Sequence, residues 1–287
     1  MQVIHEGIDT ENLGPDPDAT LVLSRRHSDP PTSSEPAPGA IRGQAGLCPS
    51  RNSETSFPEG NESREDVSLI LKAGDPIITY VARNLEPYRG FHQFMRALPA
   101  VLKAHPAAQV LIVGGDERSY GSLPTDAPNW RESMLRELTF PSPLEREGPG
   151  ERGRLPADWP TRIHFLGKLP YETYKKVLQV SALHVYLTYP FVLSWSLLEA
   201  MVTGCRILAS DTAPVREVIR DGENGELVAF FDVPGISRGI LDALNDTERG
   251  GKLRRRAQET AQAYGLAAGL QAYAQLLGLN NESINKS

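Results

Sequence analysis

The fold of this chain is decided by residues 189–219, which read YPFVLSWSLLEAMVTGCRILASDTAPVREVI. A loop leads from Tyr189 into a predicted helix, which stops at Gly204. A short apolar strand, Arg206–Ala209, follows and ends in the polar residues Ser-Asp-Thr. A continuously apolar strand is typical of a parallel sheet that helices cover on both faces. The stretch therefore predicts an α/β fold.

The same alternation of strand and helix signals extends from residue 67 to residue 247. The apolar runs that predict strands are Ile77–Val81, Val110–Val113, Ile163–Leu166, Leu183–Leu187, Ile207–Ala209 and Leu227–Phe230. The predicted helices are Phe91–Leu102, Tyr171–Val180, Ser194–Thr203, Pro214–Ile219 and Val233–Leu244, with further helices after residue 248. This alternation predicts a Rossmann-like, doubly wound parallel sheet of about six strands.

Composition divides the chain into four zones. Residues 1–22 contain a strand-like start and a proline-rich loop, whereas residues 23–66 are rich in Ser, Pro, Glu, Arg and Gly. The second segment has few large apolar side chains, so it buries too little surface to offset its ordering entropy, and we expect disorder. Residues 67–279 form the predicted α/β domain, and residues 280–287 are expected to be a frayed tail.

Charge and patterning exclude several classes of protein. The net charge of −6 over 287 residues disfavours nonspecific binding to nucleic acid. No apolar run approaches the roughly 20 residues of a transmembrane segment, and the first residues do not form a signal peptide. Cys48 and Cys205 lie far apart, which fits a reducing cytoplasm, with peripheral attachment to a membrane left open. The histidines form no zinc-spaced cluster, so we expect no metal or other cofactor.

A first candidate site follows the first predicted strand of the domain. Residues 80–91 read YVARNLEPYRGF and place Arg83 and Arg89 before the first long helix, with Gly90 as the turn into it. Ligands of open α/β sheets bind beyond the carboxyl ends of the strands. Two guanidinium groups there suit a diphosphate, because each can form bidentate charge-assisted hydrogen bonds. The alternative is a pair of solvated surface arginines.

A second candidate site is the entrance of the helix predicted over residues 194–203. The residues at this entrance are Leu193, Ser194, Trp195 and Ser196. Their backbone N–H groups and the helix dipole favour a phosphate, and Ser194 is the expected N-cap. Glu199 lies further along the helix between apolar neighbours, where its carboxylate could accept hydrogen bonds from ribose hydroxyls. An ordinary surface glutamate is the alternative.

A third candidate site is the turn after the strand predicted over Ile163–Leu166. It consists of Gly167, Lys168 and Leu169, which precede the helix that starts near Tyr171. Backbone groups in such a turn could contact the edge of a nucleobase. A simple strand-to-helix turn explains the same residues equally well.

Together these motifs resemble the C-terminal, donor-binding domain of a retaining glycosyltransferase of family 4, the glycosyl transferases group 1 type with the GT-B fold. The resemblance covers residues 76–277. The matching residues are Arg83, Arg89-Gly90, Phe165–Gly167, Leu197–Met201, Gly204, Ala209–Asp211, Pro214, Glu217–Ile219 and Asp221–Gly225. It implies a nucleoside diphosphate sugar as donor and a hydroxyl acceptor. Arg83 and Arg89 would contact the diphosphate and act in catalysis, and Glu199 would contact the ribose.

The chain departs from the family in two respects. Phe191 stands where the family usually has a glutamate near the donor sugar. The GT-B fold also has two Rossmann-like domains, and only the end of the first, over residues 2–17, is recognisable here. A missing N-terminal domain would then be a partner of this chain, either as the rest of a longer protein or as half of a split enzyme. Two functions remain open: a transferase of the hexosyltransferase type, and a non-catalytic nucleotide-sugar-binding module.

Overall fold

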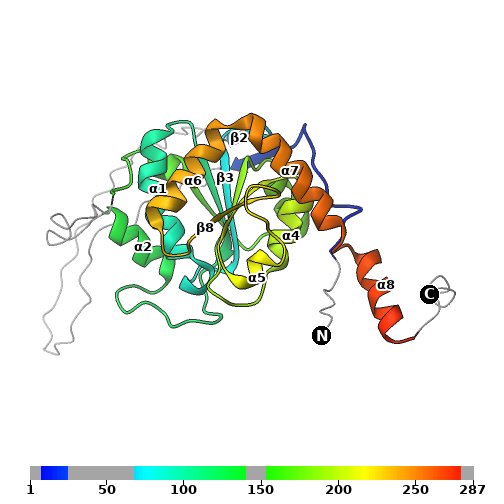
Figure 1. Ribbon diagram of the computed structural model, residues 1–287. Coiled ribbons are helices and arrows are strands. Elements are labelled where there is room, and N and C mark those ends of the chain that lie inside the picture. The colour runs from blue at the N-terminus through cyan, green and yellow to red at the C-terminus, as the bar shows by residue number, and fades with distance from the viewer. Residues whose placement is uncertain (1–7, 25–67, 140–152, 279–287) are drawn as a thin grey trace, which may run out of the picture. The chain divides into compact units, whose positions relative to one another are not determined.

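The computed structural model describes residues 8–24, 68–139 and 153–278 (Figure 1). Almost all of the segment expected to be disordered, and the whole tail 280–287, lie outside the described residues. The chain divides into two compact units, one of residues 1–21 with 71–287 and one of residues 22–70. Strands β1 (Thr20–Ser24) and β2 (Ser68–Lys72), which the sequence did not predict, form a two-stranded sheet. No helix in the described ranges is long and apolar enough to cross a membrane.

The larger unit is built on a six-stranded parallel sheet, as predicted. Its strands are β3 (Ile77–Asn84), β4 (Gln109–Gly115), β5 (Ile163–Gly167), β6 (Leu183–Tyr186), β7 (Arg206–Ser210) and β8 (Glu226–Val228). The strand order is β5-β4-β3-β6-β7-β8, and every neighbouring pair is parallel. The chain therefore winds outward from β3 in one direction and from β6 in the other, which confirms a doubly wound, Rossmann-like α/β fold.

Helices cover both faces of this sheet (Figure 1). The helices of the larger unit are α1 (Phe91–Ala104), α2 (Trp130–Thr139), α3 (Tyr171–Gln179), α4 (Trp195–Val202), α5 (Ala213–Arg216), α6 (Val233–Asn245), α7 (Thr247–Gln262) and α8 (Leu266–Leu276). Apolar residues of α1, α2 and α6 pack on one face with Ile78 and Leu208, whereas those of α4, α5 and α7 pack on the other face with Ile207. Burial on both faces explains why the strands read as continuous apolar runs.

Two helices differ from the sequence prediction. Helix α2 was not predicted, because its segment is highly charged and its fully buried apolar side chains are Met134 and Leu138, a single i, i+4 pair. Helix α5 ends at Arg216, three residues before the predicted end. Val218 and Ile219 are nevertheless buried, so the apolar pattern there reflects packing of the turn that follows α5.

Candidate functional site

The predicted donor site lies where the winding of the sheet reverses. Strands β3 and β6 are neighbours in the sheet, but their connections lead to helices on opposite faces, α1 and α4. Their carboxyl ends therefore form the topological switch point of the sheet, the usual ligand position in an open α/β sheet. A backbone hydrogen bond from Tyr189 N–H to the Tyr88 carbonyl, 2.9 Å long, joins the loops that follow these two strands.

Gly90 makes this close approach possible. It follows the 3-10 turn η1 (Pro87–Arg89) and has a φ of 73°, in the left-handed region that favours glycine. A Cβ atom at this position would lie 2.3 Å from the Cβ of Leu187, which begins the loop after β6. The glycine predicted as a turn thus also lets the β3–α1 loop pack against the β6–α4 loop.

The Arg89 side chain extends from the β3–α1 loop to the β6–α4 loop. Its Nη1 donates to the carbonyl of Val192 at 2.9 Å and to Oγ1 of Thr188 at 3.1 Å, with the Tyr186 hydroxyl at 3.5 Å. Its own carbonyl accepts a hydrogen bond of 2.7 Å from the buried Tyr80 hydroxyl. Arg89 is therefore held at the entrance of α4 from both its backbone and its side chain.

The entrance of α4 offers several free backbone donors. Ser194 occupies the N-cap position without a side-chain capping bond, and its N–H donates to the Tyr186 hydroxyl at 2.7 Å. The N–H groups of Leu193, Trp195 and Ser196 have no acceptor among the described residues. Three of the four predicted N–H groups are thus open to a ligand, and the fourth is committed to Tyr186.

Glu199 lies between α4 and α3 rather than on an open surface. Its Oε2 accepts a hydrogen bond of 2.8 Å from the hydroxyl of Tyr174 on α3. Burial raises the pKa of the Glu199 carboxyl, and this hydrogen bond opposes the rise only in part. Glu199 lies four residues after the first residue of α4, so the carboxylate is about 6 Å along the helix from its entrance. That spacing suits a ribose beside a diphosphate.

The third predicted site, the turn Gly167–Leu169, precedes helix α3, which contacts Glu199. Gly167 ends β5 with a φ of 65°, and Leu169 is two residues before α3, the helix that carries Tyr174. Lys168 extends towards the end of β4, where its Nζ lies 2.9 Å from Oε2 of Glu117. The turn and Glu199 are therefore connected through α3, whereas Lys168 is paired with a loop on another strand.

Arg83 stands apart from Arg89. It lies at the exposed carboxyl end of β3, and its guanidinium has no hydrogen bond or ion pair with another described residue. The structure thus brings Arg89 to the entrance of α4 and leaves the Arg83 guanidinium exposed at the end of β3. Sequence reasoning missed Tyr186 and Tyr174, which bind site residues directly. Tyr186 is the last residue of an apolar strand, and its position at the carboxyl end was the available signal.

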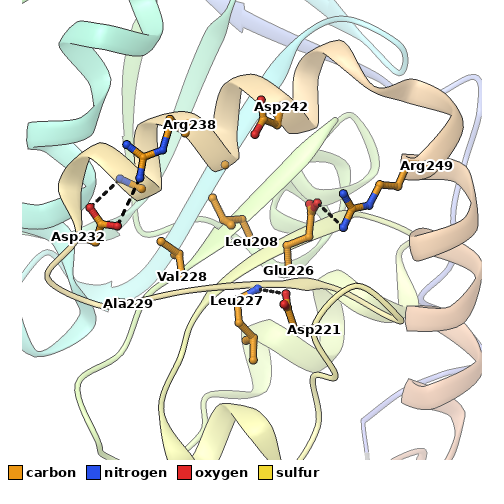
Figure 2. Close-up of a pocket in the computed structure, with 12 residues that line it drawn as sticks. Leu208, Asp221, Glu226, Leu227, Val228, Ala229, Asp232, Arg238, Asp242 and Arg249 are labelled. Carbon is orange, nitrogen blue, oxygen red and sulfur yellow. Dashed lines mark hydrogen bonds and ion pairs between the residues drawn. The ribbon is translucent and has the colours of Figure 1, made fainter.

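A separate pocket of about 390 Å³ lies between β8 and α6 (Figure 2). None of the predicted site residues lines it. Two of its four carboxylates accept backbone hydrogen bonds: Asp221 accepts from Leu227 N–H at 2.8 Å, and Asp232 accepts from Gly235 N–H at 2.9 Å as the N-cap of α6. These two groups stabilise the local turn and helix.

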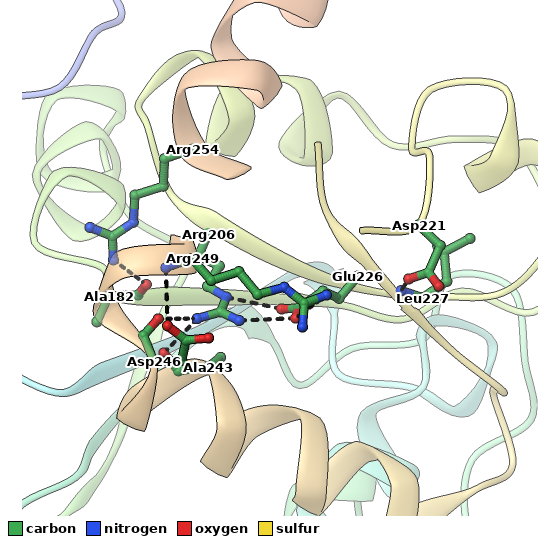
Figure 3. A network of polar contacts seen from close by, with 9 residues as sticks. All are labelled: Ala182, Arg206, Asp221, Glu226, Leu227, Ala243, Asp246, Arg249 and Arg254. Atoms are coloured by element: carbon green, nitrogen blue, oxygen red, sulfur yellow. Dashed lines mark hydrogen bonds and ion pairs between the residues drawn. The ribbon is translucent and has the colours of Figure 1, made fainter. Parts of the chain in front are cut away.

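A third acid of this pocket, Glu226, belongs to a buried ionic network (Figure 3). The Arg206 side chain is 1% exposed and donates to both oxygens of Glu226 at 2.9 Å. Arg206 also donates to the carbonyls of Ala243 and Asp246, at 3.0 Å and 2.7 Å. The network joins the first residues of β7 and β8 to the end of α6. It therefore lies at the amino ends of these strands, whereas the candidate site lies at the carboxyl ends of β3 and β6.

The sheet order and the helices on both of its faces define a Rossmann-like α/β domain. Residues 157–264 match the family model described as "Glycosyl transferases group 1", which confirms the resemblance to that group over this part of the chain. A curated relative, the D-inositol 3-phosphate glycosyltransferase of Nocardia farcinica, is 25% identical over 80% of this chain and 46% of that protein.

Solved structures show the same fold. The Anabaena HepE structure in complex with UDP-glucose has a TM-score of 0.56 and 19% identity, over 71% of this chain and 49% of that chain. The C-terminal domain of a glycosyl transferase group 1 family protein, LpcC of Francisella tularensis, has a TM-score of 0.50 and 16% identity, over 65% of this chain and 85% of that chain. The chain spans less than half of the length of the curated relatives it matches.

Proposed function

We propose that this chain is the donor-binding part of a glycosyltransferase, which moves a hexosyl group from a nucleoside diphosphate sugar to a hydroxyl acceptor with retention of configuration. The observation that carries the proposal is the position of Arg89. Its guanidinium lies at the entrance of α4, hydrogen-bonded to the Val192 carbonyl, beside N–H groups that lack acceptors. A cation and free N–H groups at a helix start together form an anion site.

The proposed roles follow from this geometry. As the bond to the sugar breaks, negative charge develops on the leaving diphosphate, and Arg83, Arg89 and the N–H groups at the start of α4 stabilise it electrostatically. Glu199 accepts hydrogen bonds from the ribose, and the turn Gly167–Leu169 contacts the base. The reaction in this proposal uses no metal cofactor, because the side chains and N–H groups supply the positive potential. A second, acceptor-binding domain completes the cleft.

Thermal unfolding with nucleotides tests the proposal. A ligand that binds the native state raises the unfolding temperature, and we expect UDP, GDP or ADP to do so. Arg89→Ala should remove most of this rise, because it deletes the cation at the entrance of α4. Arg255→Ala on α7 is the matched control, since its side chain is 73% exposed and pairs with Glu259 on the same helix. No rise with any of the three nucleotides would refute donor binding.

A non-catalytic nucleotide-sugar-binding module is the second candidate function. It is favoured by Phe191, which stands where the resembled family usually has a glutamate near the donor sugar. In that case the purified chain binds the donor but neither transfers nor hydrolyses it. Release of nucleoside diphosphate from the bound donor by the purified 287-residue chain would exclude this candidate.

A further inference from the structure

Two aromatic rings enclose the guanidinium of Arg89. The guanidinium carbon lies 5.4 Å from the ring centroid of Phe191 and 5.9 Å from that of Tyr120. The two rings also contact each other edge to face, with centroids 4.9 Å apart. Both cation distances are within the range of a cation–π interaction, which holds a cation over an aromatic face. The two rings thus contact the guanidinium in addition to the hydrogen bonds that it donates.

The three residues come from three different loops. Arg89 follows β3, Phe191 follows β6, and Tyr120 follows β4 in the irregular segment before α2. Because Tyr120 has no regular secondary structure around it, its position depends on what anchors that segment.

The anchor is the carboxylate of Glu86, which is 2% exposed. Its Oε2 accepts three backbone hydrogen bonds, from the N–H groups of Ser119, Tyr120 and Gly121, at 3.4, 3.0 and 3.2 Å. Several consecutive N–H groups that converge on one anion form a nest, and hydrogen bonds to a charged acceptor are stronger than neutral ones. Glu86 thus ties the Tyr120 loop to the same β3–α1 segment that carries Arg89.

This arrangement leaves the charge of Arg89 uncompensated. Within the described parts of the chain, no carboxylate lies within ion-pair distance of Arg89, although ten other arginines form such pairs. Its partners are a carbonyl, hydroxyls and two rings. A ring fixes the position of a guanidinium without cancelling its charge as a carboxylate would. The full charge therefore remains available to an anionic ligand.

We propose that Tyr120 and Phe191 form an aromatic clamp, which positions Arg89 for the diphosphate of the donor, and that Glu86 holds the Tyr120 arm of the clamp. These are positioning residues, because they act through Arg89 rather than on the reacting atoms. The inference rests on the proposed function and deepens it: Phe191, which replaces the expected glutamate, serves the diphosphate half of the donor.

The test compares a nucleoside diphosphate with its nucleoside by isothermal titration calorimetry. The probes are UDP, GDP and ADP with uridine, guanosine and adenosine, and the pair that binds wild type best is used. Phe191→Leu and Tyr120→Leu should each weaken diphosphate binding about fivefold and leave nucleoside binding unchanged. Tyr120→Phe keeps the ring and should bind as wild type does. Tyr273→Leu on α8 is the control for loss of an exposed tyrosine.

A double-mutant cycle separates positioning from a general structural effect. In an Arg89→Ala background, Phe191→Leu should have no further effect on diphosphate affinity, because the group it positions is gone. The clamp is disproved if wild type binds the diphosphate but both leucine variants bind it equally well, or if Phe191→Leu costs the same with and without Arg89. Absence of binding by wild type would instead overturn the proposed function, and the clamp with it.

Discussion

The Tyr174 hydroxyl donates a 2.8 Å hydrogen bond to Oε2 of Glu199 and so links helices α3 and α4 beside the candidate site. The other carboxylate oxygen, Oε1, has no hydrogen-bond partner among the described residues. One oxygen is therefore held by the protein and one remains for a ligand. The hydrogen bond from Tyr174 thus fixes the orientation of the Glu199 carboxylate. In the proposed site, the affinity for the donor should therefore depend on whether Glu199 is protonated.

Donor binding should weaken as the pH falls towards the raised pKa of Glu199. Burial lifts this pKa above its ordinary value, and only the ionised carboxylate can accept hydrogen bonds at both oxygens. Calorimetry between pH 8 and pH 5, with the nucleoside diphosphate that wild type binds best, should show the loss in wild type, whereas Glu199→Gln should bind more weakly but with a flatter pH profile. Parallel profiles for the two proteins would contradict this role of Glu199.

The same substitution should stabilise the unliganded protein at neutral pH. A carboxyl with a raised folded-state pKa contributes stability that is present below its unfolded pKa and lost as the pH rises through the folded value. At pH 7 the buried charge is therefore a cost, which Glu199→Gln removes while its amide oxygen still accepts from Tyr174. Urea unfolding should show a more stable variant at pH 7 and a smaller difference at pH 4. If Glu199→Gln were less stable than wild type at pH 7, the negative charge of Glu199 would be stabilised by its surroundings, which would contradict this prediction.

Gly90→Ala should destabilise the fold by about 2–4 kcal/mol, because it adds a clash with Leu187 to an unfavourable backbone conformation. Gly74→Ala is a matched control: its φ is 99°, but a Cβ there meets nothing within 4 Å. The control should therefore cost only the backbone strain, about 1–2 kcal/mol. Denaturant unfolding of both variants measures the difference, and equal losses would mean that Leu187 moves aside freely.

Acid should unfold the protein in part through two buried histidines. Burial lowers the pKa of His92 to about 4, with Arg96 adding to the shift, and lowers that of His184 to about 3. Both remain neutral in the folded state while the unfolded state protonates near pH 6.5, so their stabilisation is present above pH 6.5 and is lost as the pH falls.

The His92 contribution can be isolated by substitution. Between pH 7 and pH 5 the free energy of unfolding of wild type should fall by about 2 kcal/mol more than that of His92→Gln. Urea unfolding at the two pH values measures this difference. Identical pH dependence of the two proteins would mean that His92 gains a proton in the folded state.

Local patterns predicted most of the fold but less of the site. The strands were recognisable because burial on both faces makes them continuously apolar, and α1 because its apolar residues recur at helical spacing. Helix α2 was not predicted because it buries only two large apolar side chains, Met134 and Leu138. Within the site, Arg89 and the entrance of α4 could be predicted because each lies in a local motif that follows a strand, β3 or β6. The contact of Glu86 with residues 119–121 could not be predicted from the sequence, because a local pattern does not show which distant loops come into contact.

The nest that anchors Tyr120 also has a consequence for where a phosphate can settle. Three converging N–H groups would attract any phosphate, yet Glu86 already occupies them with its own negative charge. A diphosphate displaced towards β4 would meet a buried carboxylate and be repelled, whereas at the entrance of α4 it meets a cation and free donors. In the proposed donor site, Glu86 therefore occupies these N–H groups and leaves the entrance of α4 as the position for the phosphates.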